Sequence, residues 1–108
     1  MYHITALVFS GRKNPSWEVK AEKLATAFTI FEKAETDSSD SPAPIVLGYN
    51  GLQLEQGNKL WHVCRGRIFY KVNDKTILVK QDVDHQFENL LLETAPPDVA
   101  TFLRAVME

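Results

Sequence analysis

His62 and Cys64 carry side chains that could do chemistry, and they stand two positions apart in the segment "KLWHVC". The segment favours a β-strand, so this spacing puts the imidazole and the thiol on one face. A zinc or iron site would need further ligands, and none stands at metal-site spacing in the sequence. A cysteine–histidine nucleophile would need an activated thiolate, and on a regular strand Arg65 and Arg67 would face away from Cys64. The pair therefore indicates a half-buried histidine beside a small buried thiol, with a small enzyme or metal-binding protein centred on His62 and Cys64 as the alternative.

The segment Val8–Val19, "VFSGRKNPSWEV", is a second candidate because it leaves an apolar strand through a restrained turn. Gly11 permits backbone geometries that other residues resist, and Asn14 before Pro15 is held extended or in a turn. These restraints fix the direction of Trp17, which is either a core residue under the sheet or an anchor on an interaction surface. Arginine and tryptophan are enriched in binding hot spots, so the second role predicts a set of binding residues: Arg12, Lys13, Asn14, Trp17 and Tyr49.

Motifs with a defined chemistry are missing from the sequence. "SGRKNP" places a glycine and two cations after a strand, but a phosphate-binding loop needs several glycines or a helix start, and Pro15 removes one amide. "RGRIFYKV" matches an aromatic RNA-binding strand only in part. The nucleophile elbow, the zinc-protease helix and the Walker loop do not occur. We therefore predict no catalytic residue, no metal site and no cofactor.

Composition limits the class of protein and its partners. A formal net charge of -2 gives no general attraction to nucleic acid or to an anionic membrane. The length of 108 residues predicts one domain, residues 1–108. The single cysteine excludes an internal disulfide and fits a reducing compartment. With no apolar run near the roughly 20 residues of a membrane span and no signal-peptide pattern, we expect a cytoplasmic protein without a nucleic-acid or membrane partner.

The elements that must position the candidate residues begin with the segment "HITALVFS", whose nearly continuous apolar residues predict a central strand. "SWEV" is expected to be extended. From Lys20 to about Glu35, apolar residues recur at helical spacing behind a start that has no good N-cap: Ala21, Leu24, Ala25, Phe28 and Phe31. The polar segment Thr36–Pro44, "TDSSDSPAP", predicts a mobile loop.

The second half of the sequence predicts an antiparallel meander. "LGYNGLQLE" and "KLWHVC" are joined by a two-residue turn with glycine first, at Gly57-Asn58. A bulge or tight bend at Gly66 precedes "IFYKV", and a turn at Asn73-Asp74 leads into "TILVK".

Two short helices are expected at the C-terminal end. Asp82 or Asp84 can cap the first helix, and Pro96-Pro97 separates it from the second. The apolar stripe of each helix recurs at helical spacing: Phe87, Leu90 and Leu91 in the first, and Val99, Phe102, Leu103 and Val106 in the second. The order β-α-β-β-β-α-α is typical of an α+β domain. We expect a mostly antiparallel sheet of about four to five strands, with one helix from the N-terminal half and two short C-terminal helices packed on one face.

Three segments, "SGRKNPSW", "LGYNG" and "ENLLLETAPP", resemble a family of small uncharacterised bacterial single-domain proteins. The family pattern is a Ser-Gly-Arg-x-Asn-Pro-x-Trp block, a Leu-Gly-Tyr-x-Gly block and a helix near the C-terminus. Lys13 stands where the family has a proline, and Phe87-Glu88 only approximates the helical block. The shared motifs are structural, so the resemblance implies an intact domain and no particular reaction.

These patterns favour a non-catalytic protein- or peptide-binding accessory module. Either the segment Arg12–Trp17 or an edge of the sheet would receive the partner, the edge taking a peptide as an added strand. One concrete version is the partner subunit of a separate enzyme that modifies a peptide. Stoichiometric zinc or iron in the purified protein would favour the alternative at His62 and Cys64.

Overall fold

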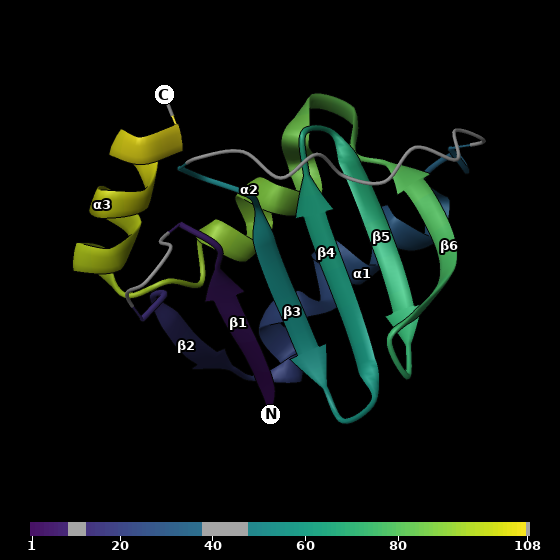
Figure 1. The fold of residues 1–108 in the computed structure, drawn as a ribbon, viewed down its shortest axis with the longest axis horizontal. Coiled ribbons are helices and arrows are strands. Elements are labelled where there is room, and N and C mark those ends of the chain that lie inside the picture. Colours follow the sequence, from purple (N-terminus) through teal and green to yellow (C-terminus); the bar gives the residue numbers. More distant parts are fainter. Residues whose placement is uncertain (9–12, 38–47, 108) are drawn as a thin grey trace.

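A single antiparallel sheet carries the fold of the computed structural model, which describes residues 1–8, 13–37 and 48–107 (Figure 1). Within these residues six strands lie in the spatial order β2-β1-β3-β4-β5-β6, and every neighbouring pair is antiparallel. Their bounds are β1 Tyr2–Ala6, β2 Ser16–Val19, β3 Leu52–Gln56, β4 Lys59–Cys64, β5 Arg67–Val72 and β6 Lys75–Gln81. The predicted α+β class is confirmed, whereas the count of four to five strands is wrong.

The additional strand is β2, for which the sequence indicated only an extended segment. It pairs along β1, with Ile4 opposite Trp17, and forms one edge of the sheet. The other neighbour of β1 is β3, where Ile4 lies opposite Leu54. The predicted central position of the first strand is therefore correct, because β1 has a partner on each side.

Helical segments flank the sheet. A 3-10 turn, η1 (Ala21–Leu24), leads into α1 (Ala25–Lys33); a second one, η2 (Val83–His85), leads into α2 (Gln86–Leu92); α3 spans Pro97–Met107. Figure 1 shows α1 and α2 behind the sheet, as predicted, whereas α3 lies at the side of the molecule near β2. The sequence predicted that both C-terminal helices pack on one face of the sheet, and only α2 does so. The second helix, α3, contributes the fully buried Leu103 to the core from the side.

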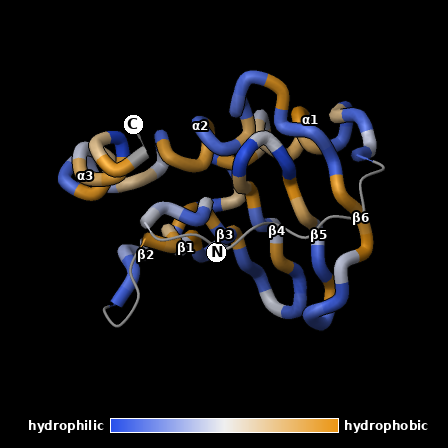
Figure 2. Tube along the Cα trace, turned by 45° about the horizontal axis from the view of Figure 1, so that its top comes forward, coloured by the Kyte–Doolittle hydropathy of each residue, from blue (hydrophilic) through white to orange (hydrophobic). Residues whose placement is uncertain are grey.

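The core lies between the sheet and the pair α1 and α2. Alternating strand residues face these helices, and Trp61 of β4 lies opposite Leu54 on one side and Tyr70 on the other. The ring of Phe28 from α1 lies 5.2 Å from that of Trp61, centroid to centroid. Figure 2 shows hydropathy along the chain: the tips of the β3–β4 and β5–β6 hairpins are hydrophilic, and hydrophobic residues gather farther along the strands.

The first helix differs in detail from its predicted stripe. No side-chain hydrogen bond caps η1 or α1, which agrees with the missing N-cap signal. Leu24 and Ala27 are buried, whereas Ala21 and Ala25 are exposed. The 3-10 start rotates the chain before α1 begins, because it winds with three residues per turn instead of 3.6. The prediction used one α-helical period from residue 20, and it therefore placed Ala21 and Ala25 on the buried face although both are exposed.

The hairpin turns follow the local sequence. Gly57 has a φ of +59°, as expected for a turn with glycine first. At Arg65 and Gly66 φ is +49° and +79°, so the predicted bend is a two-residue reversal between β4 and β5. Asn73 and Asp74 also take positive φ values between β5 and β6.

Only the start of the polar segment Thr36–Pro44 is described. Thr36 forms an antiparallel bridge with Lys80 of β6, and the Asp37 carboxylate lies 3.1 Å from Nε of Arg67. Its remaining residues, 38–44, lie outside the described part of the chain, and so does the prediction of mobility for them. Among the described residues, no helix has the length and hydropathy needed to cross a membrane.

Candidate functional site

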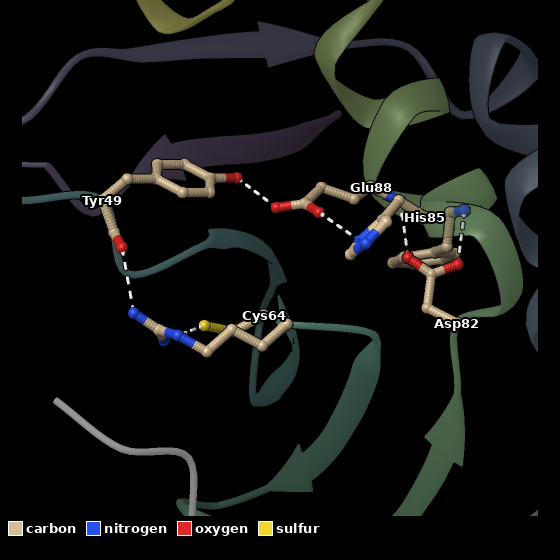
Figure 3. A network of polar contacts seen from close by, with 7 residues as sticks. Tyr49, Cys64, Asp82, His85 and Glu88 are labelled. Atoms are coloured by element: carbon tan, nitrogen blue, oxygen red, sulfur yellow. Dashed lines mark hydrogen bonds and ion pairs between the residues drawn. The ribbon is translucent and has the colours of Figure 1, made fainter. Parts of the chain in front are cut away.

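A network of polar side chains lies where the N-terminal end of α2 meets the β4–β5 turn (Figure 3). Its centre is Glu88, which is only 3% exposed. The Tyr49 hydroxyl donates a hydrogen bond to Glu88 Oε2, and His85 Nδ1 lies 3.2 Å from Glu88 Oε1. A buried carboxylate therefore holds a tyrosine and a histidine that stand 36 positions apart in the sequence.

Asp82, also 3% exposed, fixes the start of α2. Its two carboxylate oxygens accept hydrogen bonds from the backbone N–H groups of Phe87, at 2.7 Å, and Glu88, at 3.1 Å. Burial raises the pKa of Asp82, and the two amide hydrogen bonds oppose that shift. Of the two caps that the sequence allowed, Asp82 is therefore the one that satisfies the helix amides.

The backbone before α2 is strained. Asp84 and His85 both have a φ of +55°, a left-handed conformation uncommon outside glycine, although aspartate and histidine tolerate it better than most residues. The chain is anchored just before them, where the Asp82 N–H donates to the Gly66 carbonyl at 2.7 Å. The strained pair turns the His85 ring toward Glu88. The side chain of His85 is nevertheless 56% exposed. Such outliers persist where the surrounding structure enforces them, often at functional sites.

This arrangement provides an oriented imidazole at the surface. A carboxylate that binds one ring nitrogen of a histidine fixes the ring and leaves the other nitrogen for a proton or a ligand. Burial, with the Glu88 carboxylate next in importance, raises the pKa of Tyr49, which keeps its hydroxyl a neutral donor. The network therefore has fixed donors and acceptors around one accessible side chain, His85.

The pair predicted as the alternative centre, His62 and Cys64, is engaged elsewhere. His62 Nε2 lies 2.9 Å from the Asn50 carbonyl oxygen, and burial lowers the pKa of His62. Arg65 Nη1 donates to Cys64 Sγ at 2.7 Å, yet burial raises the pKa of Cys64 in spite of that cation. A raised pKa disfavours the thiolate that nucleophiles and metal ligands need. In residues 1–8, 13–37 and 48–107 no third ligand joins the pair.

The expected orientation of Arg65 is wrong. We expected its side chain to face away from Cys64, as on a regular strand. Arg65 instead occupies the turn after β4 with a φ of +49°, and its guanidinium folds back onto the sulfur.

Two of the predicted binding residues, Trp17 and Tyr49, pack into the structure. Trp17 is 7% exposed, and its indole Nε1 donates to Thr94 Oγ1 at 2.9 Å. Tyr49 is half-buried against the core, with its hydroxyl on Glu88. Trp17 therefore has the core position, which is one of the two roles left open by the sequence.

Of the other three, Lys13 and Asn14 lie shortly before β2. Asn14 Oδ1 accepts a hydrogen bond from the Val8 N–H at 3.0 Å, so this side chain links the chain just after β1 to the chain just before β2. Lys13 is exposed, and Arg12 lies outside the described residues. Their role in binding stays a prediction.

Sequence reasoning missed Asp82, His85 and Glu88 as a group. Their spacing, three positions each, is a helical spacing and was the available signal. The spacing did not predict the cluster, because Asp84 and His85 have non-helical backbone angles and the three residues do not lie on one continuous helix.

The outer edge of β6 is a second candidate surface. In its C-terminal half Thr36 bridges to Lys80, and the Asp37 N–H donates to the Val79 carbonyl at 2.8 Å. In its first half, Lys75–Ile77, all three residues are exposed, and no described residue pairs with the outer side. We refer to Lys75–Ile77 as the β6 edge.

Comparisons of the chain with protein-family models, with curated proteins and with solved structures find no match.

Proposed function

We propose that the protein is a non-catalytic binding module that takes an extended segment of a peptide or partner protein along the β6 edge. The observation that carries this proposal is Ile77, whose side chain is 61% exposed on an outermost strand of the sheet. A peptide added to a sheet edge gains main-chain hydrogen bonds from the strand and specificity from its alternate side chains.

The other half of β6 supports this mode of binding. The segment around Thr36 already lies antiparallel to β6, and the Gln81 N–H donates to the Glu35 carbonyl at 2.8 Å. An extended segment of the chain itself therefore already pairs with the outer side of this half of β6.

Local features of the β6 edge disfavour the pairing of two identical copies. The register between β5 and β6 shifts beside Lys71, which marks a bulge, and Lys75 places a positive charge on the edge strand. Bulges and edge lysines both limit indiscriminate strand pairing. A partner segment with an apolar side chain toward Ile77 and an acidic one toward Lys75 complements this edge.

In this role the protein holds a peptide while a separate enzyme modifies it. The resemblance to small bacterial single-domain proteins is part of the same proposal. We do not propose the enzyme or metal centre at His62 and Cys64, because both side chains have protein partners and the thiol is held in its neutral form.

A library of displayed random peptides, each about a dozen residues long, tests the proposal, with affinities measured on the purified full chain. We expect selected peptides to protect backbone amides of the β6 edge from hydrogen exchange. Ile77→Lys and Thr76→Pro should each weaken binding by at least about tenfold, since the first removes the apolar contact and the second an edge N–H group.

Val83→Lys is the matched control, because Val83 is also 61% exposed but lies beyond the end of β6. It should leave the affinity unchanged. Peptides whose binding survives both β6-edge substitutions, or failure to select any peptide, would contradict the proposal.

A further inference from the structure

Three potential metal ligands meet between the end of β6 and the first turn of α2. One ligand atom from each of Asp82, His85 and Glu88 can be chosen so that all three lie within 4.8 Å of one another. We propose that these residues bind one divalent transition-metal ion, with Zn²⁺ as the representative ion, through His85 Nδ1 and one carboxylate oxygen of each acidic residue. This inference is independent of peptide binding at the β6 edge.

The distances suit a common ion. With zinc–nitrogen and zinc–oxygen bonds of roughly 2.0–2.2 Å, two ligand atoms of a tetrahedral site lie about 3.4 Å apart. The observed separation of His85 Nδ1 and Glu88 Oε1 is 3.2 Å. No two of the three ligand atoms are more than 4.8 Å apart. Side-chain movements of about 1 Å or slightly more would bring even the most distant pair to the tetrahedral separation. The backbone can therefore stay as it is.

The charges of the cluster give a separate reason for a cation. Asp82 and Glu88 are each 97% buried, and in the described part of the chain neither pairs with a lysine or arginine. The one ion-pair partner that the described residues offer is the His85 imidazole beside Glu88, which can supply at most a single positive charge. Buried carboxylates are costly unless they are paired or bind a metal. A divalent ion would balance both carboxylates and leave His85 neutral.

The hydrogen bonds around the cluster hold the carboxylates without using all their acceptor sites. The Tyr49 hydroxyl binds Glu88 Oε2, which leaves Oε1 directed at His85. The amides of Phe87 and Glu88 bind the Asp82 oxygens, each of which keeps a second lone pair. Such outer hydrogen bonds orient metal ligands and raise affinity. Figure 3 shows Tyr49 and His85 on the two carboxylate oxygens of Glu88, with the Asp82 carboxylate beside the backbone amides at the start of the same helix.

The ligand set indicates the class of ion. One imidazole and two carboxylates suit Zn²⁺ and neighbouring transition metals, whereas Mg²⁺ prefers oxygen ligands alone. Three protein ligands leave at least one position for water, and the 56% exposure of the His85 side chain gives the ion a way in.

Equilibrium dialysis of the tag-free full chain against Zn²⁺, with metal analysis, tests the site. We expect one ion per chain, retained against a hundredfold excess of Mg²⁺. His85→Asn should weaken Zn²⁺ binding by at least about tenfold because it removes Nδ1, and asparagine tolerates the positive φ at this position. Glu88→Gln, which keeps an acceptor for Tyr49, should have a similar effect.

His3→Asn is the matched control, because it removes an exposed histidine from β1, outside the cluster. It should leave the affinity for Zn²⁺ within about twofold of the unsubstituted chain. Circular dichroism establishes which variants are folded, and one folded cluster variant suffices. The proposal is overturned if the unsubstituted chain binds no stoichiometric Zn²⁺, if a folded cluster variant binds it equally well, or if His3→Asn abolishes binding.

Discussion

Glycine at position 51 meets two demands at once. Its φ is +96°, and a Cβ atom built there would lie 2.2 Å from the Val63 carbonyl oxygen and 2.9 Å from Cys64 Cβ. The first demand concerns the backbone conformation of the residue itself, and the second concerns its contact with β4. Gly48 has nearly the same φ, +91°, but no atom within 4 Å of the corresponding Cβ. The two glycines therefore separate conformational strain from a steric clash.

We predict that Gly51→Ala destabilises the protein by at least about 3 kcal/mol, since overpacking against a strand backbone adds to the cost of the left-handed conformation. Gly48→Ala should cost about 1 kcal/mol, the conformational part alone. Urea denaturation of both variants measures the difference. Equal losses would show that β4 yields to the added methyl group.

At the scale of elements, Trp17 connects β2 to the segment between α2 and α3. Its Nε1 donates to Thr94 Oγ1, and the Thr94 hydroxyl donates to the Leu91 carbonyl at 2.7 Å. The indole ring itself belongs to the core. The Trp17 side chain thus connects the edge strand β2 to the segment that follows α2, 77 positions later in the sequence.

We predict that Trp17→Ala destabilises the protein by about 3–5 kcal/mol, the usual loss for a large buried aromatic. Thr94→Val should cost about 1–3 kcal/mol, because it leaves the buried indole N–H without a partner. Thr101→Val is the control, since the Thr101 hydroxyl donates to the Pro97 carbonyl at an exposed position of α3. Chemical denaturation gives all three values. A nearly unchanged stability of Trp17→Ala would return this residue to the role of a surface anchor.

The elements that the sequence predicts are those with local signals. Glycine and the Asn-Asp pair identified the turns at Gly57 and Asn73-Asp74, and alternation identified the strands they join. The position of β2 could not be predicted in the same way, because its pairing depends on β1 across an intervening segment. The same holds for the candidate site, where Tyr49 and Glu88 meet across 39 positions. Contacts of that kind arise from the packing of α2 on the sheet, and no periodic pattern in the sequence predicts them.

For the molecule as a whole, the buried titratable groups make stability depend on pH. Burial lowers the pKa of His62 below its ordinary value of 6.5. Just below pH 6.5 this histidine is therefore protonated more in the unfolded chain than in the folded chain. Stability from this group is present above pH 6.5 and is lost as the pH falls toward the folded pKa. Burial raises the pKa of Asp82 above its ordinary 3.8, so the folded chain takes up that proton first. Ionisation of Asp82 therefore reduces stability as the pH rises through its raised folded pKa.

The two groups act in opposite directions, because protonation of His62 opposes folding whereas protonation of Asp82 favours it. We predict that the unfolding free energy falls as the pH is lowered from about 7.5 to about 5.5, and that His62→Gln reduces this fall. Glutamine cannot take up a proton in this range and keeps an N–H donor for the Asn50 carbonyl. Urea denaturation across this range measures both proteins, and parallel curves for His62→Gln and the unsubstituted chain would show that His62 is not the group whose protonation opposes folding.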